Sequence, residues 1–333
     1  MPQLNLTKGH ACGVDVLLID GCPGAAAEDD RKLGLLVRRL CDRRGPVGAE
    51  AAYFVDAVAG EARVWCFGPD GAASRASAYG IGIVGRVLLD RRLANEIAVR
   101  LADKDERFTV RRSDDSPEGV KRVVVETPPI TFTAQPPIIT GRSTSVGELV
   151  PAFHERRPVT AVAVPEPQLV AIVGRYDEAE LIEVGRRVGA DGEAFPGCPD
   201  VTFLTPLDEQ SEVFARTYEY GVGVSRSSAA GVIAARAAYA RLGAASPEAP
   251  ILVRTPGGPV RAALRIEAGT WIPSLETNAT LTYSAGLDAE LLASPAPVAL
   301  ELQANIEEVM AYAALRSANA RALEAAGVRY AAP

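Results

Sequence analysis

Residues 74–80 read SRASAYG, and residues 225–231 repeat them as SRSSAAG. Five of the seven positions are identical at an offset of 151 residues, so Ser77 matches Ser228. Each copy opens a run of small and apolar residues that is too apolar for a helix on a surface. The repeat therefore predicts two similar halves, each with a buried helix that begins beside a serine.

The start of a helix suits an anionic ligand. Its first N–H groups have no acceptor within the helix, and the helix dipole favours negative charge there. Small residues also let a ligand approach the backbone. Serine at this place has a simpler role as an N-cap, but the repeat favours a ligand site.

The segments around the two copies indicate a sheet in each half. Runs rich in β-branched and aromatic residues precede each copy and predict strands, and apolar spacing predicts a surface helix over 30–44. The buried helices are expected over 78–94 and 228–243. A connector rich in Pro, Ser and Thr covers 136–160. The spacing over 298–326 predicts a last helix, with one apolar face formed by Leu302, Ile306, Val309, Ala313 and Leu323. This face packs either on the body of the protein or on a second subunit, and the spacing does not choose between them.

Composition excludes several classes of function. The 333 residues favour two domains. The net charge of −7 and the scattered arginines predict no nucleic-acid partner. The lack of a long apolar run predicts no membrane span and no signal peptide. Five cysteines without a C-x-x-C pair and two histidines predict no metal, and we expect a reduced, cytoplasmic protein.

The order of motifs resembles the diaminopimelate epimerase superfamily over residues 6–286. The matching stretches are LTKGHACGVDVLLID (6–20), DRRGPVGAEAAYFV (42–55), FGPDGAASRASAYGIGIVGR (67–86), YEYGVGVSRSSAAG (218–231) and RTPGG (254–258). The resemblance implies an α/β (α+β) fold of two pseudo-symmetric domains. Each is a rolled, mainly antiparallel sheet around a central buried helix, and a C-terminal helix is added.

The resemblance also implies the domain plan and the partners. The expected N-terminal domain covers 1–120, with a returning strand near 277–287, the second domain 121–276, and a helical extension 288–333. No cofactor is expected. A small-molecule acid substrate is expected in the interdomain cleft, and family members often pair as homodimers.

The family's chemistry uses two cysteines, one on each face of the substrate's α-carbon. Those two positions are Ser77 and Ser228 here, and a hydroxyl is a far weaker acid than a thiol. Cys66 is expected in the core. The matched glutamate, Glu219, is kept, whereas the arginine after it is Tyr220.

Substrate-facing positions have changed as well. The family's asparagines appear as Val14, Tyr79, Glu166 and Asp200, which makes diaminopimelate an unexpected substrate. The predicted substrate-binding set is Val14, Ala78, Tyr79, Gly80, Glu166, Asp200, Tyr220, Ala229 and Ala230.

Glu50 is the predicted base. It matches the single glutamate of the cysteine-free phenazine-biosynthesis isomerases, a branch of the superfamily that moves a proton along an unsaturated acid. We expect apolar neighbours, Ala49, Ala51 and Tyr53, to raise its pKa by desolvation. A purely structural role for Glu50 is an equal alternative.

The leading hypothesis is a cofactor-independent isomerase of natural-product, antibiotic-type biosynthesis that shifts a proton and a double bond in a small unsaturated amino or carboxylic acid. Glu50 would carry the proton. Ser77, Ser228 and the adjacent backbone N–H groups would hold a carboxylate or stabilise negative charge, and Glu219 would orient an amine or act as a second acid. Two alternatives stay open. One is an amino-acid epimerase or racemase that uses a Ser/Ser pair, and the other is a non-catalytic ligand-binding relative.

Overall fold

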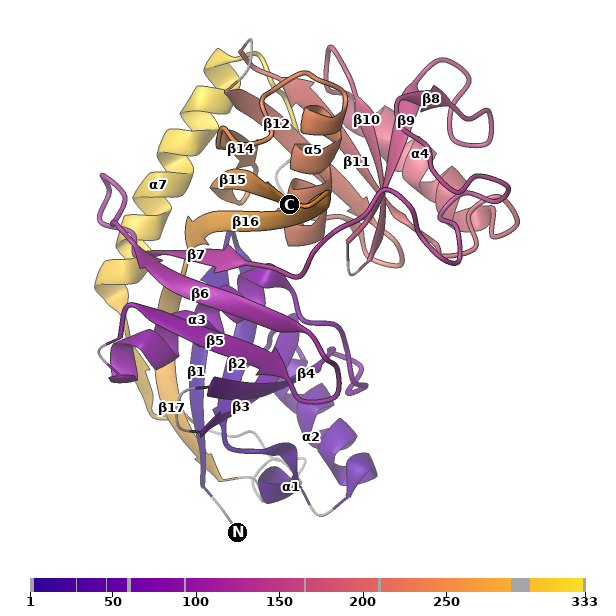
Figure 1. Cartoon of the computed structure of the whole chain (residues 1–333). Helices are drawn as coiled ribbons and strands as arrows, with labels where there is room; N and C mark the ends of the chain where they lie inside the picture. Colours follow the sequence, from indigo (N-terminus) through magenta and orange to yellow (C-terminus); the bar gives the residue numbers. More distant parts are fainter. Residues whose placement is uncertain are drawn as a thin grey trace. The chain divides into compact units, whose positions relative to one another are not determined.

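The computed structural model describes residues 3–27, 29–45, 47–58, 61–92, 94–164, 166–208, 211–288 and 300–331. The chain forms two compact units, each of which takes a late segment of the sequence. The first unit is Met1–Val125 with Thr277–Ala314, and the second is Glu126–Glu276 with Leu315–Pro333. Both mix helices and strands, so the predicted α+β class is confirmed (Figure 1).

The first unit is one sheet in the order β18-β17-β1-β2-β3-β4-β5-β6. Its strands are β1 (Gln3–Ala11), β2 (Val14–Asp20), β3 (Ala51–Val58), β4 (Glu61–Phe67), β5 (Glu96–Leu101), β6 (Arg107–Ser113), β17 (Thr280–Asp288) and β18 (Leu302–Ala304). Its helices are α1 (Pro23–Ala26), α2 (Asp30–Cys41) and α3 (Ala78–Arg92). Strand β7 (Arg122–Glu126) follows at the unit's end.

The second unit is a sheet in the order β8-β9-β10-β11-β12-β14-β15-β16, with the short β13 paired to β12. Its strands are β8 (Glu148–Leu149), β9 (Pro158–Ala163), β10 (Pro167–Ile172), β11 (Asp200–Pro206), β12 (Glu212–Glu219), β13 (Gly223–Val224), β14 (Ile251–Thr255), β15 (Gly258–Glu267) and β16 (Thr270–Asn278). Its helices are α4 (Glu178–Ala190) and α5 (Ala229–Arg241).

The two units repeat one topology. From β1 to β6, successive pairs are antiparallel, parallel, antiparallel, parallel and antiparallel. The series β9-β10-β11-β12-β14-β15 has the same succession. In each unit a helix fills each parallel connection, α2 and α3 in the first and α4 and α5 in the second. The prediction of two pseudo-symmetric halves is confirmed.

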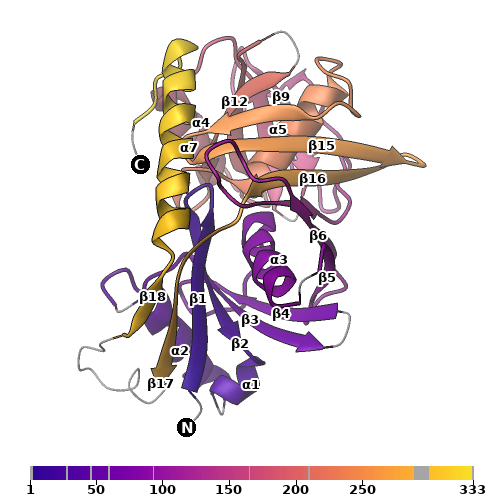
Figure 2. The same cartoon turned by 90° about the vertical axis from the view of Figure 1, so that its left-hand side faces the viewer.

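Helices α3 and α5 are the central helices of their units. Helix α3 contacts β1, β2, β3, β5 and β6 (Figure 2), and α5 contacts the β9–β12 strands, β14 and β15. Twelve of the 15 residues of α3 are buried. Such burial on all sides explains why these sequences show no polar face, and it confirms the prediction of two buried helices.

The C-terminal segment differs from the prediction. Residues 302–304 form β18 on the edge of β17, and the helix α7 begins only at Ile306 and ends at Ala325. Its buried side chains are Tyr312, Asn319 and Leu323, whereas Leu302, Ile306, Val309 and Ala313 are exposed. Of the predicted apolar face, Leu323 alone packs on the body of the chain, and Leu302 lies in a strand rather than in the helix. Packing of the exposed Ile306, Val309 and Ala313 on a second subunit stays a prediction. The buried face includes polar groups with specific partners, since Asn319 donates a hydrogen bond to the Thr255 carbonyl.

Residues 136–160 are more than a connector. Ile138, Ile139, Val150 and Phe153 are buried in the same hydrophobic cluster as α4 and β11. This segment is part of the second unit's core, which its Pro-, Ser- and Thr-rich composition concealed. Within the described residues, none of the helices is both long and apolar enough to cross a membrane.

Candidate functional site

The start of α3 lies against the phenol of Tyr53 on β3. Tyr53 is buried, and its hydroxyl oxygen accepts a hydrogen bond from the Ser77 backbone N–H at 3.0 Å. The Ser77 hydroxyl oxygen accepts from the Tyr79 N–H at 3.2 Å. Gly80 makes this approach possible, because a Cβ there would lie 2.2 Å from the Tyr53 hydroxyl oxygen. The repeat's glycine is thus required by packing.

The start of α5 has a serine and a glycine at the matching positions and different neighbours. Ser228 is the N-cap, and its hydroxyl oxygen accepts from the Gly231 N–H at 3.2 Å. Beside it, the hydroxyls of Thr202 and Thr217 are hydrogen-bonded to each other at 2.9 Å. A Cβ on Gly231 would lie 2.1 Å from the Thr217 hydroxyl. Capping by Ser228 is therefore observed, and a ligand role for either serine stays a prediction.

Glu50 lies directly before β3, in a cluster of charges. Its N–H donates to the Asp15 carbonyl at 3.0 Å, and its Oε1 lies 3.5 Å from Nη2 of Arg43. About half of the side chain, 49%, is exposed. The expected desolvation by apolar neighbours is therefore wrong for this position. Tyr53, one of those neighbours, directs its hydroxyl to α3 instead.

Asp15 is the centre of this cluster. Arg43 binds it with both Nη atoms at 2.6 Å, and Nζ of Lys8 lies 2.9 Å from its Oδ2. Burial alone would raise the pKa of Asp15, but the hydrogen bonds and charges of Arg43 and Lys8 outweigh it and hold the pKa below its usual value. The cluster thus holds Arg43 beside Glu50.

Asp200 is the perturbed carboxyl of the second unit. Its Oδ1 accepts from the Tyr220 N–H at 2.8 Å, and its Oδ2 accepts from Nε2 of Gln168 at 2.9 Å. Burial raises the pKa of Asp200 in spite of these two hydrogen bonds. The fold therefore brings two predicted residues, Asp200 and Tyr220, into direct contact. It adds Gln168, a residue outside the predicted set, as a second partner of Asp200.

The other predicted positions lie where their motifs place them. Glu219 ends β12 and Val14 begins β2, each half-buried, and Glu166 is half-buried just before β10. The remaining members of the set lie in the first turns of the two central helices: Ala78, Tyr79 and Gly80 in α3, and Ala229 and Ala230 in α5. Their binding roles stay predictions.

The described residues add three groups that the sequence did not single out: Tyr53, Arg43 and Gln168. Tyr53 and Gln168 stand in apolar strands, where a polar side chain is a weak signal by itself. Cys66, by contrast, lies in the core as expected. Burial is the main cause that raises the pKa of its thiol to about 12, so it is inert as a nucleophile.

Comparison with known proteins gives the family. No family model matches the chain. The diaminopimelate epimerase of Lactiplantibacillus plantarum is 30% identical to it over 276 residues, which are 78% of this chain and 81% of that enzyme.

Solved structures share the fold at low sequence identity. A phenazine biosynthesis protein of the PhzF family from Bacillus anthracis is similar with a TM-score of 0.61 and 11% identity, over 86% of this chain and 100% of that one. Methylitaconate-delta-isomerase is similar with a TM-score of 0.61 and 10% identity, over 90% of this chain and 98% of that one.

Proposed function

The chain belongs to the diaminopimelate epimerase superfamily and is an isomerase, and from this premise we propose that it moves a proton, and with it a double bond, in a small unsaturated amino or carboxylic acid without a cofactor. One observation supports this most: both family cysteine positions are serines whose oxygens accept hydrogen bonds from their own helices. A thiol pair that takes and gives a proton is therefore absent from these two positions, and another group has to be the base.

Glu50 is the base in this proposal. Its carboxylate is half exposed and lies 3.5 Å from Nη2 of Arg43, so it is accessible and held near a fixed partner. A carboxylate is a weak base, and it suits a substrate whose C–H is acidified by a conjugated carboxyl group. After taking the proton from one carbon, Glu50 returns it to another carbon of the same conjugated system, and the double bond shifts.

The negative charge that develops on the substrate needs donors. The first turn of α3 has N–H groups that receive no acceptor from the helix backbone. That of Tyr79 donates to the Ser77 hydroxyl, so the proposal relies on the other N–H groups of this turn. Ser77 and Tyr53 fix the position of this turn. Donors that are already in place stabilise a developing charge without reorganisation. Ser228 and Glu219 belong to the second unit, and their part in the reaction stays a prediction.

Solvent exchange tests the proposal. The full chain is incubated in D₂O with methylitaconate, and NMR follows both the appearance of deuterium and the shift of the double bond. We expect Glu50→Gln to lower the rate by about 100-fold or more, the range of general-base contributions. Glu96→Gln is the matched control, an exposed carboxylate of the same unit beside Arg111. Glu50→Gln with full activity would exclude this mechanism.

Asp200 favours a second candidate, the inversion of an amino acid by a Ser/Ser pair that this carboxylate activates, because burial raises the pKa of Asp200 and so makes it a stronger base. Here LL-diaminopimelate and L-proline are the probes. Deuterium at the α-carbon with loss of optical rotation, abolished by Asp200→Asn and by Ser77→Ala, would support inversion. Binding without exchange would support a non-catalytic relative.

A cytoplasmic location, a homodimer and a role in antibiotic-type biosynthesis stay predictions. The role in biosynthesis rests on analogy of fold alone.

A further inference from the structure

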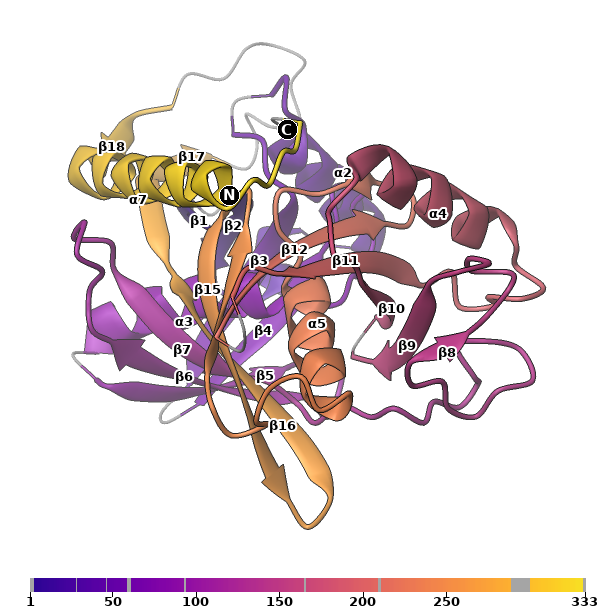
Figure 3. The ribbon, with the colours of Figure 1, turned by 90° about the horizontal axis from the view of Figure 1, so that it is seen from above.

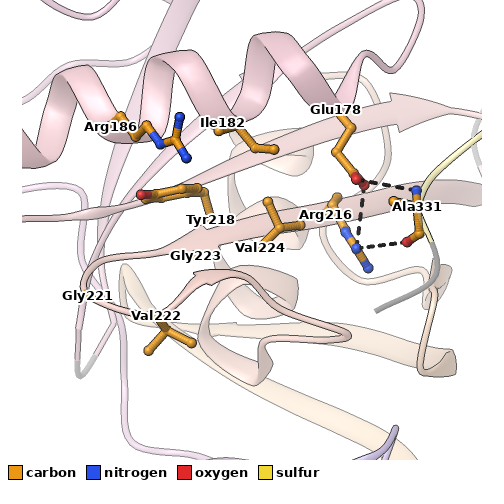
Figure 4. A pocket seen from close by; sticks show the side chains of 10 residues that line it. All are labelled: Glu178, Ile182, Arg186, Arg216, Tyr218, Gly221, Val222, Gly223, Val224 and Ala331. Carbon is orange, nitrogen blue, oxygen red and sulfur yellow. Dashed lines mark hydrogen bonds and ion pairs between the residues drawn. The ribbon is translucent and has the colours of Figure 1, made fainter.

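A pocket of about 470 Å³ lies in the second unit between α4, the end of β12, β13 and the last described residue, Ala331. Figure 4 shows Arg216, Glu178 and Ala331 at one end of it, Arg186 and Tyr218 at the other, and Ile182 and Val224 between them. The residues of the predicted site are absent from its lining.

This pocket and the start of α5 lie on opposite faces of β12. Successive residues of a strand point to opposite faces of the sheet. Thr217 meets α5, since a Cβ on Gly231 would touch its hydroxyl, whereas its neighbour Tyr218 meets α4 at Gly185. Arg216 shares the face of Tyr218. Figure 3 shows α4 and α5 on the two sides of these strands. The pocket is thus separate from the Ser228 helix start.

Arg216 is an unusual group to find in a pocket wall. Its side chain is only 2% exposed. Its Nη2 lies 3.4 Å from Oε2 of Glu178 and donates to the Ala331 carbonyl at 3.4 Å. Within the described part of the chain, its Nε and Nη1 have no hydrogen-bond partner. Buried donors without partners are rare because they lose their hydration.

The only acidic group described beside Arg216, Glu178, makes a long ion pair of 3.4 Å with it. Glu178 is shared, since it also accepts from the Tyr176 hydroxyl at 3.0 Å and from the Ala331 N–H at 3.3 Å. The ring of Tyr330 lies 5.7 Å from the guanidinium carbon and covers one side of it. An anion that enters the pocket could therefore accept hydrogen bonds from Nε and Nη1 of a guanidinium group that is already shielded from water.

The other end of the pocket carries a second positive charge. Arg186 is exposed on α4, one turn after Ile182. The charged groups of the lining are Arg186, Arg216 and Glu178, which leaves an excess of one positive charge. Ile182 and Val224 offer apolar contact between the two guanidinium groups (Figure 4).

We propose that this pocket binds a small aliphatic dicarboxylate, with one carboxylate on Arg216, the apolar chain over Ile182 and Val224, and the second carboxylate near Arg186. The buried Arg216 supplies most of the affinity because charge-assisted hydrogen bonds are strongest where water is excluded. The exposed Arg186 supplies the preference for a dicarboxylate over a monocarboxylate, and water screens its contribution.

Titration calorimetry of the full chain tests this with three probes: glutarate, butyrate and inorganic phosphate. We expect glutarate to bind most tightly. Arg216→Met is expected to weaken glutarate by roughly tenfold or more, and Arg186→Gln by a few-fold, to the level of butyrate. Arg187→Gln is the matched control, a neighbour on α4 that pairs with Glu183 at 2.7 Å, and it should leave binding unchanged.

A second variant avoids dependence on the folding of Arg216→Met. Ile182→Phe fills the middle of the pocket from a half-buried position, and it should abolish glutarate binding while the circular dichroism spectrum stays the same. Ser228→Ala should leave glutarate binding intact. Tighter binding of phosphate than of glutarate, equal binding of butyrate and glutarate, or loss of binding in Ser228→Ala but not in Ile182→Phe would each overturn the proposal.

Discussion

The starts of the two central helices have serine and glycine at matching positions, but different hydroxyl groups lie beside them. At α3, the phenol of Tyr53 accepts from the Ser77 N–H. At α5, Thr202 and Thr217 bind each other, and Ser228 caps the helix. The ring of Tyr53 on β3 thus takes the place beside α3 that Thr202 on β11 and Thr217 on β12 take beside α5.

This difference shows which parts of the repeat are fixed. The pairing pattern of the strands and the glycine one turn into each helix recur in both units. The side chains beside the first turn do not recur, and neither do the carboxyls: Asp15 has a lowered pKa and Asp200 a raised one. The fold conserves the direction of two helix starts and leaves their chemistry free to differ.

The largest expected effect comes from filling the two glycine positions. Gly80→Ala and Gly231→Ala should each lower the free energy of unfolding by about 2–3 kcal/mol, the upper range for overpacked cores, measured by urea denaturation. The two should differ in rescue. Thr217→Ala removes the atom 2.1 Å from the new methyl group, whereas Tyr53→Phe leaves a ring carbon at 2.3 Å.

We therefore expect Thr217→Ala to restore part of the stability of Gly231→Ala, since the Thr202 hydroxyl stays 2.9 Å from the new methyl group, and Tyr53→Phe to restore little for Gly80→Ala. Gly24→Ala is the control, because a Cβ there would meet nothing within 4 Å. Equal rescue in both units would mean that the ring and the threonine pair are equivalent supports.

An intermediate effect separates the two carboxyls by pH. The folded pKa of Asp15 is lowered, so its stabilisation is present above its unfolded pKa and is lost as the pH falls through the folded pKa. Asp15→Asn should cost about 1–2 kcal/mol at pH 7, in line with hydrogen bonds to charged groups, and much less near pH 3. Thermal unfolding at several pH values measures this.

Asp200→Asn should show the opposite sign. The folded pKa of Asp200 is raised, so its contribution is most favourable below its unfolded pKa and is lost as the pH rises through the folded pKa. At pH 7 the variant should therefore be as stable as the parent chain or more stable, and the difference should vanish in acid. Gln168 can turn its amide to accept from the new side chain. A large loss at pH 7 would contradict the raised pKa.

The smallest effect compares the two serines. Ser228→Ala removes a buried N-cap hydrogen bond and should cost about 1 kcal/mol. Ser77→Ala should cost less, about 0.5 kcal/mol, because the Ser77 side chain is half-buried and a water molecule can replace its hydroxyl. Ser228→Thr keeps the cap and serves as the control. A larger loss for Ser77→Ala in thermal unfolding would reverse the comparison.

The sequence predicted the repeated helices because their signal is local. A run of small and apolar residues after Ser77 or Ser228 has no polar face, so burial follows directly. The C-terminal helix shows the limit of such reasoning. Its apolar residues suggested a face that the structure leaves in solvent, because Tyr312 and Asn319 have partners that lie far away in the sequence.

The candidate site was predictable only in part, for the same reason. The serines and Asp200 follow from motif positions. The ion pair of Glu50 with Arg43, and that of Arg43 with Asp15, join residues that meet only through the fold. Arg216 is one polar residue in the strand EVFARTYE. The packing of α4 and of the last described residues buries Arg216, leaves its Nε and Nη1 without hydrogen-bond partners among the described residues, and forms the pocket beside it.

The glycines at 80 and 231 also set the rotational register of the two central helices. A turn of either helix about its own axis by one residue would bring a methyl or larger group against Tyr53 or Thr217, where only a hydrogen atom fits. Each helix is therefore fixed in its rotation about its own axis, and its first N–H groups point in one direction. An engineer could exchange the side chains at 77 and 228 for other donors or acids and still know where they would be aimed.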